Sequence, residues 1–260
     1  FGASGQVGRN LIRKLTKNNY KIIAVTRNIH RKGYLLKTQA NPGYLELVEL
    51  TNFSSNKIED LMKNCSVCIN LIGILYEKKK DHFKILHTDF PDLLSQKANE
   101  LKIDKFIHLS SLGIEKAIDS KYASSKLEGE LKVVKNFKNS IILKPSIVYS
   151  VDDNFTTNFM TLLSRFPIMP LYYNGQTKFT PIHVSDLVNI ICEMVEKKYS
   201  NLTLECLGPE ILTFKDMINN LLSSIDKKRL LISLPLPLAK LSAKILQLLP
   251  KPLLTEDQLN

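Results

Sequence analysis

Short apolar runs alternate with helical periodicity through most of the chain. The β-rich runs predict strands over residues 20–26, 45–50, 67–71, 105–109, 140–143 and 203–207. Between them, apolar residues recur three and four positions apart, as on one face of a helix. Such faces are formed by Val7, Leu11, Ile12 and Leu15, by Leu93, Leu94, Ala98 and Leu101, and, in a helix beginning near Ser185, by Val188, Ile191, Cys192 and Val195. The alternation predicts an α/β fold with a Rossmann-type doubly wound parallel sheet.

The regular alternation ends after Pro145, where irregular aromatic and Pro-containing loops such as 165–170 follow. We therefore expect two domains. A dinucleotide-binding Rossmann domain is predicted over 1–150, completed by residues from about 183 to 207. A smaller C-terminal lobe, of the kind that normally holds the substrate, is predicted over 151–182 and 208–260.

Both ends of the chain carry an expectation of their own. The chain opens at Phe1-Gly2, inside a motif, so we expect the first strand to be truncated and the chain to be a fragment. Near the other end, the apolar stretch from Leu238 to Leu249, with Lys240 and Lys244, predicts a terminal helix. It is too short to span a membrane, and both a packed helix and a helix docked on a membrane surface or partner protein fit it.

Composition narrows the function classes. With 44% hydrophobic and 23% charged residues among 260, the chain is typical of a globular protein, and no apolar run approaches the roughly 18 residues of a membrane span. The 36 Lys and Arg against 25 Asp and Glu give a net charge of +11, which favours acidic partners such as nucleotide phosphates, anionic lipids or acidic proteins. No zinc-finger spacing and no aromatic-plus-basic RNA signature is present, so a nucleic acid partner is not expected.

The four cysteines do not form a disulfide framework, which points to a reducing compartment. Cys65 and Cys68 formally make a C-x-x-C motif. The motif opens the apolar run of a predicted strand, and no second Cys or His pair stands at ligand spacing. We therefore expect burial of these thiols and no metal site.

The strongest motif is Gly2-Ala3-Ser4-Gly5-Gln6-Val7-Gly8, which leads directly into an amphipathic helix. The first glycine allows a tight turn, the second lets the backbone approach a pyrophosphate, and the third lets the helix pack on the sheet. The helix N-terminus adds N–H groups and a positive dipole. The spacing predicts a dinucleotide site that includes Gly2, Ser4, Gly5, Gln6 and Gly8.

Arg27 stands 19 positions after Gly8, at the end of the second predicted strand, where NAD-binding proteins carry an acidic residue for the ribose hydroxyls. A guanidinium at this position can pair with a 2′-phosphate, and Arg31 and Lys32 can assist. The sequence therefore favours NADP(H), with NAD(H) as the alternative.

Tyr122 and Lys126 stand four positions apart, on one face of a predicted helix, and Ser110-Ser111 ends the preceding strand. In such an arrangement the ammonium group is expected to lower the phenol pKa from about 10, which makes the tyrosine a usable acid or base. A serine hydroxyl orients a carbonyl. The candidate catalytic set is therefore Tyr122 and Lys126 with one serine, Ser110 or Ser111.

These residues resemble the short-chain dehydrogenase/reductase superfamily, in its extended and atypical branches. The segments Ile69–Gly73, Lys105–Ser110, Lys144–Ser146 and Pro181–Asp186 also occur in the order found in the nucleotide-binding accessory subunits of respiratory complex I, NADH:ubiquinone oxidoreductase, and their bacterial relatives. Phe166–Leu171 and the Leu234–Pro237 segment are similar too. The resemblance covers essentially the whole chain.

The resemblance implies a tightly held NADPH with a mainly structural role, in an accessory or assembly protein of complex I. It implies a peripheral location on the cytoplasmic face of a bacterial inner membrane, or on the matrix side in mitochondria, with complex I subunits as partners and a membrane surface or a quinone as further ones. By position, it assigns Gly2, Gly5 and Gly8 to the phosphate loop and Arg27 to the 2′-phosphate. It also implies that Ser111, in preference to Ser110, is the serine of the catalytic set Ser111, Tyr122 and Lys126. It adds Asn70, Gly73, Ser110, Tyr122, Lys126 and Pro145 to the cofactor-binding set.

In one respect this chain departs from the accessory subunits, and the difference is compatible with catalysis. Animal accessory subunits lack the catalytic serine, whereas this chain keeps Ser111 together with Tyr122 and Lys126. The alternative function is therefore an NADPH-dependent reductase, epimerase or dehydratase, with a link to ubiquinone metabolism suggested by related members. The second lobe shows no residue set that identifies a substrate.

Overall fold

The computed structural model of the chain describes residues 1–117, 119–235 and 257, and these divide into two compact units. Unit 1 comprises Phe1–Pro145 and Val184–Cys206, and unit 2 comprises Ser146–His183 and Leu207–Asn260. The predicted helix over 238–249 lies outside the described residues. Within the described residues, no helix has the length and apolar character needed to cross a membrane.

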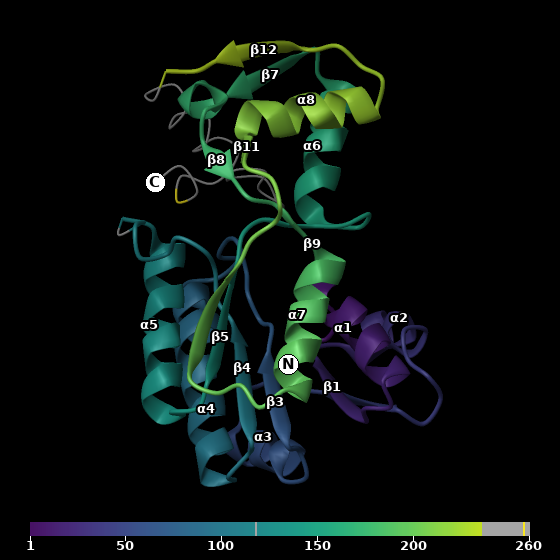
Figure 1. Cartoon of the computed structure of the whole chain (residues 1–260), viewed down its shortest axis with the longest axis vertical. Helices are drawn as coiled ribbons and strands as arrows, with labels where there is room; N and C mark the ends of the chain where they lie inside the picture. The colour runs from purple at the N-terminus through teal and green to yellow at the C-terminus, as the bar shows by residue number, and fades with distance from the viewer. Residues whose placement is uncertain (118, 236–256, 258–260) are drawn as a thin grey trace. The chain divides into compact units, whose positions relative to one another are not determined.

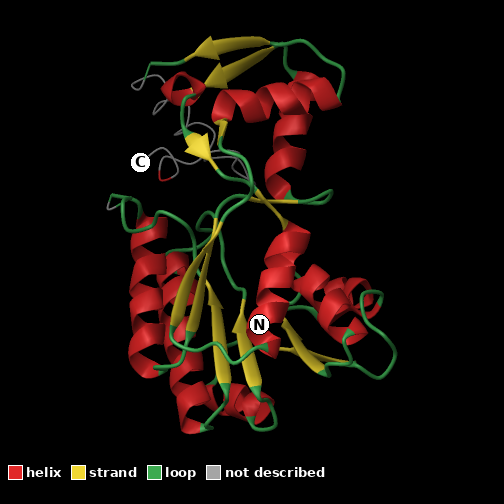
Figure 2. Ribbon diagram, viewed as in Figure 1, coloured by secondary structure: helices red, strands yellow, loops and turns green. Residues whose placement is uncertain are grey.

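Unit 1 is a parallel α/β unit (Figures 1 and 2). Its strands are β1 (Ile22–Thr26), β2 (Leu45–Glu49), β3 (Val67–Asn70), β4 (Lys105–Leu109), β5 (Ile141–Pro145) and β10 (Leu202–Cys206). Its helices are α1 (Gln6–Lys17), α2 (Ile29–Lys37), α3 (Ser55–Met62), the π-helix η1 (Lys84–Asp89), α4 (Phe90–Glu100), α5 (Lys121–Asn136) and α7 (Val184–Glu196). All six predicted strands form within two residues of their predicted bounds, so the α/β fold class is confirmed.

The strands form two parallel groups in the order β2-β1 and β3-β4-β5-β10. Figure 2 shows α4 and α5 on one face of these strands and α1 and α7 on the other, as in a doubly wound sheet. The central strand β5 is buried along its whole length, because helices cover both faces. One apolar cluster joins β3, β4 and β5 to α3, α4 and α5, and Phe90 and Phe106 are its bulkiest fully buried members.

The predicted helix faces are the buried ones. Leu11, Ile12 and Leu15 of α1 are buried, and Ile12 packs with Ala24 of β1 and Leu36 of α2. Cys68 is buried in β3, and burial raises the pKa of its thiol to about 12, which keeps it protonated and inert as a nucleophile.

Unit 2 is built from short elements. Its strands are β6 (Val148–Tyr149), β7 (Ile168–Leu171), β8 (Lys178–Phe179), β9 (Ile182–His183), β11 (Leu212–Thr213) and β12 (Leu230–Ser233), and its helices are α6 (Asn154–Arg165), the 3₁₀-helix η2 (Tyr172–Gly175) and α8 (Phe214–Ser224). The interpretation of 165–170 as irregular loop is wrong in part, because residues 168–171 pair in parallel with β12, about 60 positions later. Leu163, Met169, Phe214 and Ile218 form the core of this unit.

Candidate functional site

The glycine-rich loop turns so tightly that its glycines are required by geometry. Gly2 has φ +82°, and a Cβ there would lie 2.9 Å from the carbonyl carbon of Leu71. A Cβ at Gly8 would lie 2.6 Å from the carbonyl oxygens of Gly2 and Ala3. The amide of Gly5 closes the turn by donating to the carbonyl of Gly2 at 3.0 Å. Side chains at positions 2 and 8 would therefore force the loop open.

The loop delivers the chain into α1 with an N-terminus suited to an anion. Gly5 is the N-cap, no described side chain caps this end, and no acidic residue lies in the first turn of the helix. The first backbone N–H groups and the helix dipole thus present positive charge to the adjoining space. The Arg9 guanidinium holds the loop from the other side by donating to the carbonyl of Ser4 at 3.0 Å.

A cavity of about 270 Å³ adjoins this helix end. Its walls come from the loop, from the ends of β1 and β2, from the segment after β3 and from the start of α4. The lining residues are Phe1, Gly2, Ser4, Gly5, Val25, Thr26, Arg27, Leu50, Phe53, Leu71, Ile72, Gly73, Ile74, Leu86 and Phe90. The cavity lies at the carboxyl ends of parallel strands, where ligands bind in open α/β sheets. Five predicted residues meet here: Gly2, Ser4, Gly5, Arg27 and Gly73.

Arg27 is exposed at the mouth of this cavity, directly after β1. Asn28 caps helix α2, its side-chain oxygen accepting from the amide of Arg31 at 2.8 Å. The Glu49 carboxylate, at the end of β2, accepts from the amide of Ile29 at 2.7 Å. The Glu49 carboxylate is therefore held by the first turn of α2. Among the residues that line the cavity, Arg27 carries the charge.

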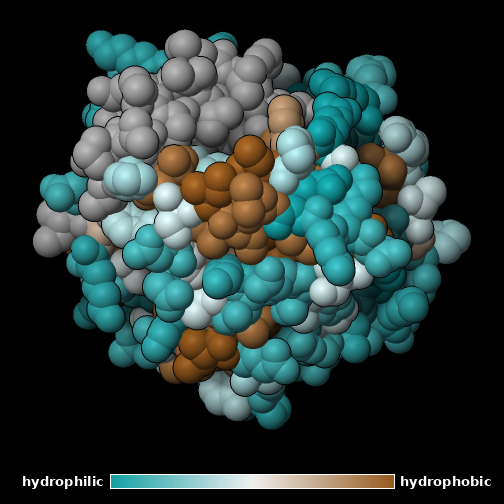
Figure 3. Space-filling model, turned by 90° about the horizontal axis from the view of Figure 1, so that it is seen from above, coloured by the Kyte–Doolittle hydropathy of each residue, from teal (hydrophilic) through white to brown (hydrophobic). Residues whose placement is uncertain are grey.

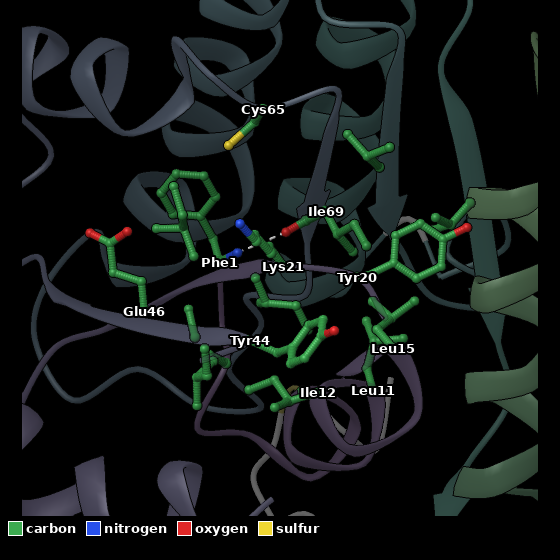
Figure 4. A pocket seen from close by; sticks show the side chains of 18 of the residues that line it. Phe1, Leu11, Ile12, Leu15, Tyr20, Lys21, Tyr44, Glu46, Cys65 and Ile69 are labelled. Atoms are coloured by element: carbon green, nitrogen blue, oxygen red, sulfur yellow. Dashed lines mark hydrogen bonds between the residues drawn. The ribbon is translucent and has the colours of Figure 1, made fainter. Parts of the chain in front are cut away.

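A larger groove of about 650 Å³ lies elsewhere, between β1 and β3 (Figure 4). Apolar side chains such as Leu11, Ile12 and Leu15 line it, together with Tyr20 and Tyr44. The main chain of Phe1 pairs with β3 at its end: its amine donates to the carbonyl of Ile69 at 2.8 Å, and its carbonyl accepts from the amide of Leu71 at 3.1 Å. In a doubly wound sheet the strand before the glycine loop runs at this position. We therefore do not assign the groove to a ligand.

Tyr122 and Lys126 project from the first turns of α5, which begins after its N-cap Ser120. The Tyr122 hydroxyl is hydrogen-bonded to the side chain of Ser111. Lys126 Nζ donates to the carbonyl of Leu109 at 3.0 Å, and a Cβ built on Gly73 would lie 3.4 Å from that nitrogen. Lys126 thus stands beside Gly73, in the segment that forms one wall of the cavity.

The electrostatics differ from the sequence-based expectation. Burial raises the pKa of the Tyr122 phenol above its usual value, although the Ser111 hydrogen bond acts in the opposite direction. The expected lowering by the neighbouring ammonium is wrong for this structure, because burial of the phenol outweighs the influences that favour its ionised form. Burial also lowers the pKa of Lys126 to about 8, with Glu130 opposing the shift.

Ser110 faces away from Tyr122. Its hydroxyl donates to Glu130 Oε2 at 2.9 Å, and Glu130 Oε1 lies 2.8 Å from Lys144 Nζ. Lys144 also pairs with Glu115. Glu130 and Lys144 are buried, so each ion depends on the other for compensation. Ser110 therefore belongs to a buried polar network, and Ser111 is the serine next to the tyrosine.

His87, which the sequence did not single out, connects the two halves of the site. The amide of Ile74 donates to its Nε2 at 3.1 Å, so Nδ1 carries the proton and faces Ser125 Oγ at 3.0 Å. The ring also meets Tyr122 edge-on, with centroids 5.3 Å apart. Burial, and then the charge of Lys126, lower the pKa of His87 to about 3, which keeps it neutral. The apolar spacing of Phe83, Leu86 and Phe90 around it was the available signal of burial.

Three other predicted residues, Asn70, Pro145 and Gln6, lie outside the cavity lining. Asn70 is buried, and its side chain contacts His108 Nδ1 at 3.2 Å and accepts from the amide of Ile72 at 3.1 Å. Pro145 is buried at the end of β5, and its carbonyl accepts from the amide of Leu112 at 3.0 Å. Gln6 begins α1. None of these three residues lines the cavity.

Sequence comparison places this site in a known family. The sequence profile of the NAD dependent epimerase/dehydratase family matches residues 1–205, most of the chain. The chain belongs to this family. The membership accounts for the glycine loop, the strand order and the Tyr-Lys pair on α5.

The proteins that this chain resembles differ in role. The chain is 24% identical over 262 residues to the mitochondrial NADH-ubiquinone oxidoreductase 40 kDa subunit of Neurospora crassa, covering 100% of this chain and 68% of that one. It is 25% identical over 187 residues to the ceramide reductase of Caulobacter vibrioides, covering 71% of this chain and 56% of that one. A dTDP-glucose 4,6-dehydratase from Streptomyces venezuelae, solved with NAD, shares the fold with a TM-score of 0.74 and 17% identity over 89% of this chain and 83% of that one. The predicted resemblance to complex I subunits is thus confirmed.

Proposed function

We propose that the chain binds a dinucleotide, with NADP(H) preferred over NAD(H), at the cavity beside the glycine loop. The observation that carries this proposal is the α1 N-terminus, which no described side chain caps and which adjoins the cavity, at the end of a loop whose main chain leaves no room for a Cβ at positions 2 and 8. A pyrophosphate fits this donor set, because backbone N–H groups and the helix dipole stabilise it together. Arg27 supplies the charge that a 2′-phosphate requires.

We further propose that the protein is an accessory or assembly protein of respiratory complex I, in which the dinucleotide is mainly a structural ligand. Similarity to a complex I subunit along the whole chain supports this role. A ligand that binds only the folded chain stabilises it by mass action. The expected place is peripheral, on the cytoplasmic face of a bacterial inner membrane or the mitochondrial matrix side, with complex I subunits as partners and a membrane surface or a quinone as further candidates.

Gly5→Asp tests the binding site. The backbone of Gly5 has φ −74°, which any residue adopts, so aspartate places a carboxylate at the helix end with modest strain. We expect dinucleotide retention to fall below detection, because the carboxylate repels a pyrophosphate. Asn220→Asp adds the same negative charge at an exposed position of α8, outside the cavity, and as the control it should retain the ligand. Full retention by Gly5→Asp would exclude the site.

Arg27→Gln tests the choice of cofactor. Removing one charge-assisted contact to a 2′-phosphate should weaken NADPH about 10- to 100-fold and leave NADH within a few-fold. Lys37→Gln removes a charge from the far end of α2 and serves as the control. Calorimetric titration of both cofactors decides the outcome, and equal losses for NADPH and NADH would leave Arg27 without a role in selection.

Comigration tests the assembly. The full-length protein, in mildly solubilised native membranes, should comigrate with assembled complex I on a native gel analysed by mass spectrometry. Migration as a free protein under conditions that keep the complex intact would argue for a stand-alone enzyme or a transient assembly factor.

One observation favours a second function, an NADPH-dependent reductase, epimerase or dehydratase. The hydrogen bond between Ser111 and Tyr122, with Lys126 four positions on, is the arrangement such an enzyme needs, and a ceramide reductase is among the relatives. A reduced dinucleotide supplies hydride-transfer chemistry. Ser111 would orient a carbonyl, and Tyr122, protonated at neutral pH because its pKa is raised, would hold the proton that the oxygen takes up.

Tyr122→Phe separates the two functions. In an enzyme it should lower turnover at least about 100-fold with cofactor binding unchanged, as expected for loss of a general acid. In a structural subunit it should leave complex assembly intact. Full turnover by this variant with an identified substrate would rule out the proposed acid.

A further inference from the structure

The two-stranded sheet β7–β12 in unit 2 is apolar on its outward face as well as over most of its inward face, where Ser233 is the exception. On the inward face, Met169 and Leu231 are paired in register and pack on the core formed with α6 and α8. On the other face, Ile168 is paired with Leu230, and Pro170 with Ile232. Leu230 is 60% exposed, Ile168 49% and Ile232 41%. We call these four outward residues, together with Phe166, which is 56% exposed, the β7–β12 face.

A sheet with one solvated face normally alternates apolar and polar residues. Here the outward positions of both strands are apolar, and none carries a hydrogen-bonding side chain. Figure 3 looks down on the side of the molecule where β12 lies in Figure 1, and it shows apolar side chains gathered there beside hydrophilic ones. Scattered exposed apolar residues need no explanation, but a contiguous set on one flat surface marks an interaction site.

Four cations border this face at the ends where both strands begin. Arg165 ends α6, and Lys227, Lys228 and Arg229 lead into β12. The amide of Leu230 donates to the carbonyl of Pro167 at 3.0 Å, which brings the two basic segments together. With Asp226 as the one carboxylate in 165–171 and 226–235, four positive charges less one negative leave +3.

Two of the four cations are held by hydrogen bonds to main-chain carbonyls of α6. Arg229 Nε donates to the carbonyl of Leu163 at 2.7 Å, and Lys227 Nζ donates to that of Ser164 at 3.1 Å. These contacts occupy the carbonyl end of α6, where cations are stabilising. Arg165 and Lys228 make no ion pair or side-chain hydrogen bond with any described residue, and both are exposed. Two cations are thus available to an external anion.

We propose that the β7–β12 face docks on the surface of an anionic lipid bilayer. Aliphatic side chains enter the boundary between headgroups and acyl chains, while the basic border meets lipid phosphates. Long cationic side chains suit this role, because their stems lie along apolar surface and their charges reach the headgroups. A protein partner normally contributes directional hydrogen bonds at an interface. The outward residues offer none, and this favours the bilayer.

Sedimentation of the full chain with phosphatidylcholine vesicles, with and without phosphatidylglycerol, tests the proposal. We expect binding to the anionic vesicles alone, decreasing with added salt. Arg165→Gln with Lys228→Gln should weaken binding about fivefold per cation removed. Ile168→Thr, Leu230→Thr and Ile232→Thr together should weaken it at least about tenfold, because less apolar area enters the bilayer. Threonine has the β-branched shape that strands favour.

Leu131→Thr and Lys135→Gln, exposed positions on α5, are the matched controls and should bind like the parent chain. Thermal unfolding verifies that each variant is folded. The apolar segment 236–249 stays in every variant, so equal binding by the triple threonine variant would overturn the proposal in favour of another part of the chain. Absence of binding, with or without a concentration-dependent dimer in sedimentation equilibrium, would overturn it as well. Membrane binding by this face does not require complex I, so the comigration experiment can fail independently.

Discussion

His87 Nδ1 and Ser125 Oγ lie 3.0 Å apart, and this contact ties the wall of the dinucleotide cavity to the helix that carries Tyr122. On one side His87 accepts the amide hydrogen of Ile74, which lines the cavity. On the other, the Ser125 hydroxyl donates a hydrogen bond to the carbonyl of Tyr122 at 2.8 Å. The chain from Ile74 to Tyr122 works only with a neutral histidine protonated at Nδ1, because both ring nitrogens are then satisfied.

Replacing His87 by phenylalanine keeps an aromatic ring but removes the acceptor for Ile74 and the donor for Ser125. We expect a loss of about 1–3 kcal/mol in the free energy of unfolding, the usual effect of leaving partly buried polar groups unpaired. Urea denaturation measures it. His30→Phe, at an exposed position on α2, should stay within about 0.5 kcal/mol of the parent. Equal stability of the two variants would mean that the His87 contacts contribute little.

Acid should destabilise the protein through the same residue. The folded chain keeps His87 neutral to about pH 3, whereas the unfolded chain takes up a proton near the ordinary pKa of about 6.5. Between these values the unfolded state binds more protons, so stability falls as the pH falls. One histidine contributes up to about 1.4 kcal/mol per pH unit. Buried His108, whose pKa is also lowered, acts in the same direction.

The difference between the parent and His87→Phe isolates this contribution. Urea unfolding at a series of pH values from about 7 to 4 should show a smaller pH slope for the variant, while carboxylates affect both chains alike. Identical slopes would show that His87 has the same pKa in the folded and unfolded states.

Much of unit 1 follows from the sequence, because parallel strands covered on both faces are continuous apolar runs and their helices carry one apolar stripe. The glycine loop and Arg27 were found for the same reason: local spacing specifies them. Contacts between distant residues could not be predicted in this way. Asn70 and His108 are 38 positions apart, and Glu130 and Lys144 are 14, yet each pair meets across neighbouring elements.

The β7 strand was missed for a different physical reason. Its residues Ile168–Leu171 are apolar at every position and include Pro170, so no alternation marks a strand and the prolines suggest a loop. The partner that completes it, β12, starts at Leu230. The π-helix η1 could not be predicted from periodicity either, because its six residues are too few to show a period of their own.

Gly129 provides a sharp test of how η1 packs on α5. A Cβ at this helical position would lie 1.7 Å from the carbonyl oxygen of His87, and the obstacle is main chain. Alanine in place of a helical glycine ordinarily stabilises by about 1 kcal/mol. Here we expect Gly129→Ala to destabilise by at least about 2 kcal/mol, because η1 must move.

Gly33→Ala in α2 is the matched control for Gly129→Ala. The Cβ at Gly33 would meet Ile29 Cγ2 at 3.1 Å, and a side chain of this kind can shift. In thermal and urea unfolding, Gly129→Ala should therefore be less stable than the parent chain. Gly33→Ala should be more stable than the parent or equally stable. A stabilised Gly129→Ala would contradict the close approach of η1 to α5.

Two buried lysines near the site should respond in opposite directions to the same substitution. Lys126 has one hydrogen bond, and burial lowers its pKa to about 8, so at neutral pH the folded state holds a poorly compensated cation. Its destabilising effect disappears as the pH rises from about 8 towards the unfolded value of about 10.5, because the folded state then releases the proton first. We expect Lys126→Met to be neutral or to stabilise the ligand-free protein by up to about 2 kcal/mol.

Lys144→Met should destabilise instead, by about 3–5 kcal/mol, because it leaves the buried carboxylate of Glu130 without a counter-ion. Measuring dinucleotide retention by both variants then distinguishes an effect on stability from an effect on binding. Lys126 stands beside Gly73 at the cavity wall, so its variant should lose affinity while gaining or keeping stability, whereas Lys144→Met should keep affinity at temperatures where it is folded. If Lys126→Met is more stable and binds the dinucleotide more weakly, Lys126 serves the ligand and not the fold. Folding alone gives no reason to keep a poorly compensated buried cation. If Lys126→Met instead unfolds like Lys144→Met, the ammonium of Lys126 is a structural group, and its place in the cofactor site is lost.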